Sequence, residues 1–213
     1  DLTNESSGTV TVTVAGTQVG ASKVQFVDGA AGTFINRGAF NIVAGDLDLN
    51  GGTIDNQGGG VIGGLGTITG NVTSTGTTAP GSSIGEMTVS GAWTQNAGGT
   101  FEIEIGGSGG VAGTDFDLLS VGGAATFNGG TITVNAWNDF KPAFGETFDV
   151  LVATGLSDTT GHTLTLGGTY GAQFLYQVVN GTTLRLTSQV PEPASMSLLL
   201  LAATALLNRR RRN

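Results

Sequence analysis

Glycine is the residue that most constrains how this chain can fold. Of the 213 residues, 38 are Gly and only 4 are Pro, and Gly follows no strict triplet. Collagen needs Gly at about every third residue together with abundant Pro, so the glycine here serves another architecture. Only Gly takes a positive φ without steric cost, and Asn tolerates that region better than other side chains. The composition therefore predicts a chain that turns sharply and often.

Between the turns the sequence repeats and alternates. The segments Gly32–Gly38 and Gly52–Gly58 agree at four of their seven positions, with an offset of 20 residues. Segments such as Phe101–Ile105 place apolar side chains on one face and Thr or Glu on the other, which is the period of a strand. An offset of about 20 residues is typical of one coil of a parallel β-helix. We therefore expect an all-β fold built as a right-handed parallel β-helix, or β-solenoid.

The end of the body predicts a different kind of pairing. Asn180-Gly181, followed by the alternating Leu184–Leu186, is a hairpin signal. A terminal hairpin would protect the open edge of a stack of strands. We therefore expect a more antiparallel C-terminal part, and we divide the chain into β-helix repeats (1–155), a strand or hairpin cap (156–189) and a separate C-terminal segment (190–213).

Composition excludes several classes of protein. Charged residues make up 11% of the chain and Cys is absent. A coiled coil or a basic nucleic-acid binder needs far more charge, and neither a disulfide framework nor a Cys metal cluster is possible. We expect no nucleic-acid partner. The net charge is −8, and four of the eight basic residues lie in Arg209–Arg212, so the body is more acidic than the whole chain.

The C-terminal segment has three parts in order. A rigid extended motif, Val190-Pro191-Glu192-Pro193, precedes an uncharged run over residues 194–207 and a cluster of four Arg. The run predicts a short transmembrane helix, since a full crossing takes about 20 residues and a shorter one relies on local thinning of the bilayer. The positive-inside rule keeps the Arg cluster cytoplasmic. The anchor positions are Met196, Leu198, Leu199, Leu200, Leu201, Leu206 and Leu207, and the topology-setting residues are Arg209, Arg210, Arg211 and Arg212.

This order of parts resembles the PEP-CTERM sorting signal of Gram-negative, biofilm-forming bacteria, and the resemblance covers residues 190–213. It implies transient anchoring in the inner membrane and recognition of the Pro-Glu-Pro segment by an exosortase, which removes the tail. An exported protein also carries a secretory signal. Asp1 is not an initiator Met, and no basic region with an apolar core follows it. We therefore expect the given sequence to lack its N-terminus, including a signal peptide.

The body resembles the passenger β-helix of autotransporter-type surface proteins over roughly residues 30–155. The motifs that carry this resemblance are Gly66–Val72, Ala79–Gly85, Gln95–Ile105 and Asp115–Val121. They are structural, so they imply a fold and surface display and transfer no catalytic residues. The chain ends in the sorting segment where an autotransporter has its outer-membrane barrel.

Chemistry-bearing residues are few. The single His, His162, lies in a predicted turn, and no GxSxG elbow or phosphate-binding loop is present. The carboxylate pairs Asp46/Asp48, Glu102/Glu104 and Asp115/Asp117 are each spaced so that both members of a pair share a strand face. We interpret them first as the polar face of strands, and keep open a Ca²⁺ site or a catalytic pair for glycoside hydrolysis. The segment Gly109–Asp115 resembles a single calcium-binding nonapeptide with its spacing off by one residue.

These observations predict a non-enzymatic exported protein with a structural or adhesive role at the cell surface or in the extracellular matrix. We expect no catalytic residues, no metal ligands and no cofactor. The expected partners are the exosortase, which binds transiently, and exopolysaccharide or other cell-surface polymers. The alternative is a carbohydrate-active β-helix enzyme, either a polysaccharide lyase or a glycosidase. That alternative has little support, because the basic residues of the body are dispersed along the chain.

Overall fold

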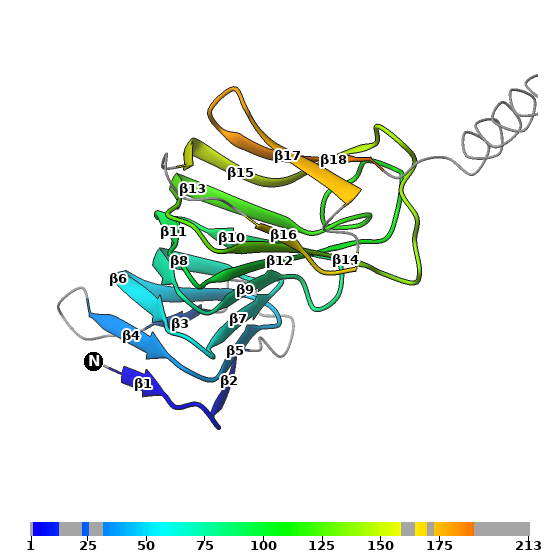
Figure 1. The fold of residues 1–213 in the computed structure, drawn as a ribbon. Helices are drawn as coiled ribbons and strands as arrows, with labels where there is room; N and C mark the ends of the chain where they lie inside the picture. The colour runs from blue at the N-terminus through cyan, green and yellow to red at the C-terminus, as the bar shows by residue number, and fades with distance from the viewer. Residues whose placement is uncertain (1, 13–22, 26–31, 159–164, 170–172, 190–213) are drawn as a thin grey trace, which may run out of the picture.

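The computed structural model describes residues 2–12, 23–25, 32–158, 165–169 and 173–189, which form two β-sheets (Figure 1). The larger sheet has eleven strands and the smaller has seven. In spatial order the larger sheet contains β1 (Leu2–Asn4), β4 (Thr33–Asn36), β6 (Asp46–Asn56), β8 (Thr67–Ser74), β10 (Glu86–Val89), β13 (Leu118–Phe127), β15 (Thr147–Asp158), β18 (Thr183–Ser188) and β17 (Phe174–Val179), with β3 (Lys23–Gln25) beside β6 and β11 (Trp93–Gln95) between β8 and β13. The smaller sheet contains β16 (Thr165–Gly167), β14 (Thr131–Ala136), β12 (Thr100–Ile105), β9 (Thr77–Pro80), β7 (Val61–Gly64), β5 (Ala39–Ile42) and β2 (Thr9–Val12).

From β4 to β9 the chain alternates between the two sheets, so each strand pairs with a strand one layer away. Figure 1 shows these layers following one another from the blue N-terminal end toward β15. The repeat of 20 residues is confirmed as the register of one such pair, because Thr33 lies opposite Thr53 and Asn36 opposite Asn56. The predicted alternation is confirmed as well. In β12, Phe101, Ile103 and Ile105 are buried while the two Glu between them are half-buried on the outer face.

The prediction of a right-handed parallel β-helix is wrong, although the all-β class is confirmed. Pairs in the smaller sheet are parallel, but the larger sheet is mixed, because β18 pairs antiparallel with both β15 and β17. The cause is the predicted hairpin, which is confirmed. Asn180 and Gly181 have φ of 54° and 69° and reverse the chain between β17 and β18. The mixed sheet also includes β15. This strand runs across residue 155, the predicted boundary between the β-helix repeats and the cap.

The predicted C-terminal transmembrane helix is not supported. Within the described ranges no segment is a helix long and apolar enough to cross a membrane. The predicted anchor, like the sorting motif and the Arg cluster, lies in residues 190–213, outside the described residues.

The core lies between the two sheets and takes apolar side chains from both. Its later layers are aromatic. The ring of Trp93 lies 5.4 Å from that of Phe101 and 5.1 Å from that of Phe127, measured between centroids, in tilted and edge-on geometry. Phe148 packs edge-on against Phe116 in the same way. Such arrangements let the positive edge of one ring meet the negative face of another.

The earlier layers bury amides beside one aromatic pair, Phe34 and Phe40. Asn4, Asn36, Asn56 and Ser74, which we call the amide ladder, occupy the same register position in successive strands of the larger sheet. The Nδ2 atom of each Asn donates to the next side chain, at 2.8 Å from Asn4 to Asn36, 2.7 Å from Asn36 to Asn56, and 2.9 Å from Asn56 to Ser74. The ladder satisfies polar groups that would otherwise be costly inside the protein.

Glycine makes room for this ladder. A Cβ on Gly60 would lie 2.5 Å from both the backbone oxygen of Asn36 and the Oδ1 of Asn56, which is too close for any side chain. Gly60 is not among the positive-φ residues. Some of the glycine is therefore required by close approach between layers, in addition to the turns that the composition predicted.

Candidate functional site

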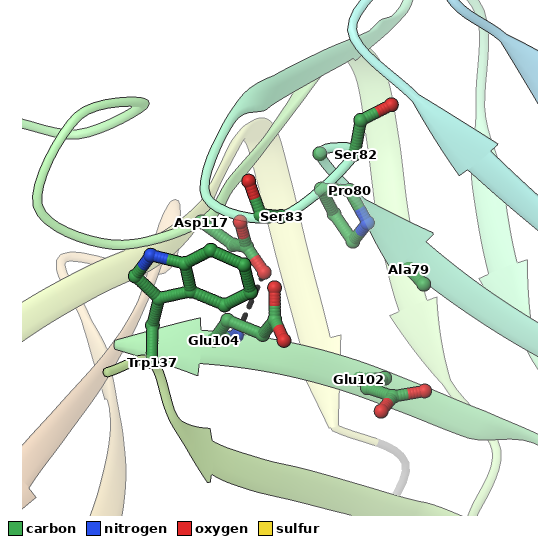
Figure 2. A pocket seen from close by; sticks show the side chains of 9 residues that line it. Ala79, Pro80, Ser82, Ser83, Glu102, Glu104, Asp117 and Trp137 are labelled. Carbon is green, nitrogen blue, oxygen red and sulfur yellow. Dashed lines mark hydrogen bonds between the residues drawn. The ribbon is translucent and has the colours of Figure 1, made fainter. Parts of the chain in front are cut away.

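The candidate site is a pocket of about 290 Å³ on the outer side of the smaller sheet, which we call the acidic pocket (Figure 2). It is formed by the end of β9 and the loop that follows it, by β12, and by single residues beside β13 and β14. Its lining residues are Ala79, Pro80, Gly81, Ser82, Ser83, Glu102, Glu104, Asp117 and Trp137. A volume of this size is at the small end of the range for ligand sites.

The alternation of β12 presents two carboxyl groups to this pocket. Phe101, Ile103 and Ile105 point into the core, so Glu102 and Glu104 must lie together on the outer face. Glu102 accepts a hydrogen bond of 2.9 Å from the amide of Asn135 on β14. The shared face expected for this pair is confirmed.

Asp117 contributes a third carboxyl group, which joins two elements. The side chain is only 1% exposed. Its Oδ1 accepts from the backbone N–H of Gly85 at 2.9 Å, and its Oδ2 accepts from the backbone N–H of Glu104 at 2.7 Å. The carboxyl group thereby ties the loop after β9 to β12, and Figure 2 shows it beside the carboxyl group of Glu104.

Burial dominates the electrostatics of the pocket. Loss of hydration raises the pKa of Asp117 to about 8, helped by the nearby charges of Glu104 and Glu102 and opposed by the two backbone N–H donors. Burial also raises the pKa of Glu104, and the charge of Glu102 adds to this effect. Both shifts have the same origin, since a charged carboxylate loses hydration in the pocket and meets others of the same sign.

Trp137 forms the aromatic wall. Its backbone N–H donates to the carbonyl of Ile105 at 2.8 Å, so the residue comes directly after the pairing of β14 with β12. The side chain is 38% exposed. A Cβ on Gly106 would lie 3.0 Å from side-chain atoms of Trp137 and 2.6 Å from Ile84, so the glycine lets the indole pack against the end of β12.

The other predicted carboxylates do not enter the pocket. Asp48 is buried in β6 and accepts from the backbone N–H of Asn50, while Asp46 is only half-buried. Asp115 accepts from the backbone N–H of Val111 and organises the glycine-rich loop before Asp117. Both Asp115 and Asp117 precede β13, so the strand face expected for this pair is not present.

Metal binding finds no support in the described part of the chain, where no group of three or more His, Asp or Glu is arranged to hold an ion. His162 lies outside the described residues. Trp93, the other Trp of the chain, is fully buried in the core. Sequence reasoning missed the combination of Asp117, the loop after β9 and Trp137. No local motif joins them, although the position of Trp137 directly after an alternating strand was a usable signal in the sequence.

Comparison with known protein families finds no match to this chain, and comparison with curated proteins finds none either. The sorting-signal and passenger resemblances therefore stay predictions, and the case for function comes from the acidic pocket and the sequence.

Proposed function

We propose that this protein is a non-enzymatic surface or extracellular-matrix protein that adheres to polysaccharide, with the acidic pocket as its saccharide-binding site. The observation that carries the proposal is an exposed indole next to several hydrogen-bond acceptors. A Trp face stacks on the apolar face of a sugar ring, and carboxylates accept hydrogen bonds from its hydroxyl groups. Export and sorting through residues 190–213, with an exosortase as transient partner, deliver the protein to the surface.

The bonding of the carboxyl groups favours binding over catalysis. Glycoside hydrolysis needs a carboxylic acid that can give its proton to the leaving group and a second carboxylate that attacks or activates water. Both oxygens of Asp117 accept backbone N–H groups, and Glu102 is held by Asn135. Only Glu104 combines a raised pKa with a side chain that no described residue binds.

Glycosidase activity stays as the alternative, and one observation favours it. Glu104 has the raised pKa of a general acid and shares a strand face with Glu102. This reading requires Glu102 to leave Asn135 and act as nucleophile or base. An assay for released reducing sugars distinguishes it from simple binding.

Retention on immobilised exopolysaccharide from the producing cells tests the proposal. We expect the full chain to be retained, and Trp137→Ala to lose about tenfold in affinity, which corresponds to about 1.4 kcal/mol, because the aromatic face on which the sugar ring stacks is removed. Phe144→Ala is the matched control, since Phe144 is an exposed aromatic outside the pocket. Equal retention of the parent and Trp137→Ala would contradict the proposed site.

Mass analysis of the protein recovered from its own cells tests the sorting step. Processing predicts a C-terminus near Pro193 and loss of the four Arg that close the sequence. A recovered chain that still carries Arg209–Arg212 would show that the tail is not removed, and the proposed sorting would be wrong.

A further inference from the structure

We propose that the acidic pocket takes a protonated amine carried on a sugar ring, so that its ligand is a polysaccharide with free amino groups. This inference rests on the saccharide-binding function proposed above and names the class of sugar. Its basis is the combination of a ring-sized cavity, an aromatic wall and carboxyl groups that no basic side chain among the described residues compensates.

The charge of the pocket is uncompensated within the described residues. Arg37 lies beside Glu5, and Arg185 pairs with Asp149. No ion pair in the described ranges joins a basic side chain to Glu102, Glu104 or Asp117. Three carboxyl groups therefore share one small cavity, where like charges raise the free energy of the ionised state. A ligand that brings positive charge relieves this repulsion.

Glu104 is the group best placed to receive the ligand. Its backbone N–H is used by Asp117, but its carboxyl group accepts no hydrogen bond from any described residue. The side chain is half-buried on the pocket face of β12. A partly desolvated carboxylate without a donor is a strong acceptor for an ammonium group, and such charge-assisted bonds are about twice as strong as neutral ones.

Trp137 and the two Ser residues specify a sugar rather than a bare amine. The indole face attracts a cation and also stacks on the C–H face of a sugar ring. Ser82 and Ser83, in the loop after β9, add hydroxyl groups that both donate and accept hydrogen bonds, which matches the hydroxyl groups of a sugar. The volume of about 290 Å³ suits one ring of a longer polymer.

A divalent cation is a poorer fit to the same charge. No set of three acidic or His side chains in the described residues is arranged around one point. Both carboxyl oxygens of Asp117 already accept backbone N–H groups. An ammonium group needs only one or two acceptors and tolerates this arrangement.

The test is calorimetric titration of the full chain with three probes: the tetramer of β-1,4-linked glucosamine, the same tetramer fully N-acetylated, and tetralysine. At a pH where the amines are protonated, we expect the glucosamine tetramer to bind about tenfold or more tightly than the acetylated one, as expected for one charge-assisted hydrogen bond. Added salt should reduce this difference.

Two variants locate the effect. Glu104→Gln should remove the preference for the free amine, and it should fold normally because no described residue binds the Glu104 carboxyl group. Glu86→Gln is the matched control, since Glu86 is an exposed acid on β10 outside the pocket. An unchanged thermal midpoint for Glu104→Gln confirms that the loss is one of binding.

The outcomes separate this inference from the proposed function. Equal binding of the two sugar tetramers overturns the amine preference and leaves saccharide binding in place. Binding of tetralysine as tight as that of the glucosamine tetramer overturns the sugar, and makes the site one for a basic peptide. If neither tetramer binds while the chain is retained on exopolysaccharide through another surface, this inference is wrong and adhesion stands.

Discussion

The amide ladder and the acidic pocket both remove polar side chains from water, but they satisfy them differently. In the ladder, neutral amides bond to one another from layer to layer, so each residue finds its partner at the same position of the neighbouring strand. In the pocket, the buried carboxyl group of Asp117 depends on backbone N–H groups of two other segments. The ladder follows from the repetition of the sequence. The arrangement around Asp117 exists only where the repeat is interrupted.

The interruption is visible in the register column that contains the ladder. Asn36, Asn56 and Ser74 are followed in the same column by Gln95 and then by Phe127. The segment between Gln95 and Phe127 contains β12 and the glycine-rich loop that carries Asp115 and Asp117. This segment is longer than the earlier repeats. At its end Phe127 occupies the position of the amide in the core, and its β12 and loop residues line the pocket on the outside.

The largest expected effect is a dependence of stability on pH that arises in the pocket. The pKa of Asp117 is about 8 in the fold against 3.8 for an ordinary Asp, so folding favours the protonated form. This contribution to the free energy of unfolding is complete below about pH 4 and is lost as the pH rises toward about 8. At about 1.4 kcal/mol per pKa unit, the loss amounts to several kcal/mol.

Denaturant unfolding across this pH range measures the effect. Asp117→Asn should flatten the profile, because the amide cannot ionise, although it keeps only one of the two acceptor oxygens. Asn56→Ala should lower stability in the ladder and keep the slope of the parent, since no proton is involved there. A steep profile in Asp117→Asn would place the titrating group elsewhere and remove this distinction between the two regions.

The same comparison shows how far sequence reasoning reaches. Alternation in Phe101–Ile105 and the offset of 20 residues correctly predicted which side chains share a face and which strands pair. Periodicity also suggested a parallel β-helix, which is wrong, because the predicted hairpin at Asn180-Gly181 joins the larger sheet itself and makes that sheet mixed. A local repeat carries no information about where a terminal hairpin docks.

The hydrogen-bond partners inside the ladder and the pocket could not be predicted from the sequence for a similar reason. Asn was interpreted as a turn residue, which is correct for Asn50 and Asn180 at positive φ. Asn36 and Asn56 are instead fully buried, and their partners become visible only when the strands are in register. Asp117 contacts a strand 13 residues away and a loop 32 residues away, and neither separation matches the repeat.

The second prediction concerns the ladder, where the expected effect is smaller. Leu branches at Cγ as Asn does but is bulkier and cannot form hydrogen bonds, so Asn56→Leu tests whether an apolar side chain can replace the amide at this position. The change removes the Asn56 donor from the Oγ of Ser74 and from the backbone carbonyl of Thr77. It also leaves the amide of Asn36 with one of its two acceptors, the backbone carbonyl of Val61. An unsatisfied buried polar group costs about 1–3 kcal/mol, and we expect a loss of at least this size in the free energy of unfolding.

Asn41→Leu is the matched control, because Asn41 is a half-buried amide on the outer face of β5 and forms none of the ladder bonds. Its effect should stay within about 0.5 kcal/mol. Equal stability of the two variants and the parent would mean that an apolar side chain serves as well as an amide at position 56. Phe127 occupies the same column three layers later. It would then be a simple substitution in the repeat, and the contrast between the two regions would come from the pocket alone.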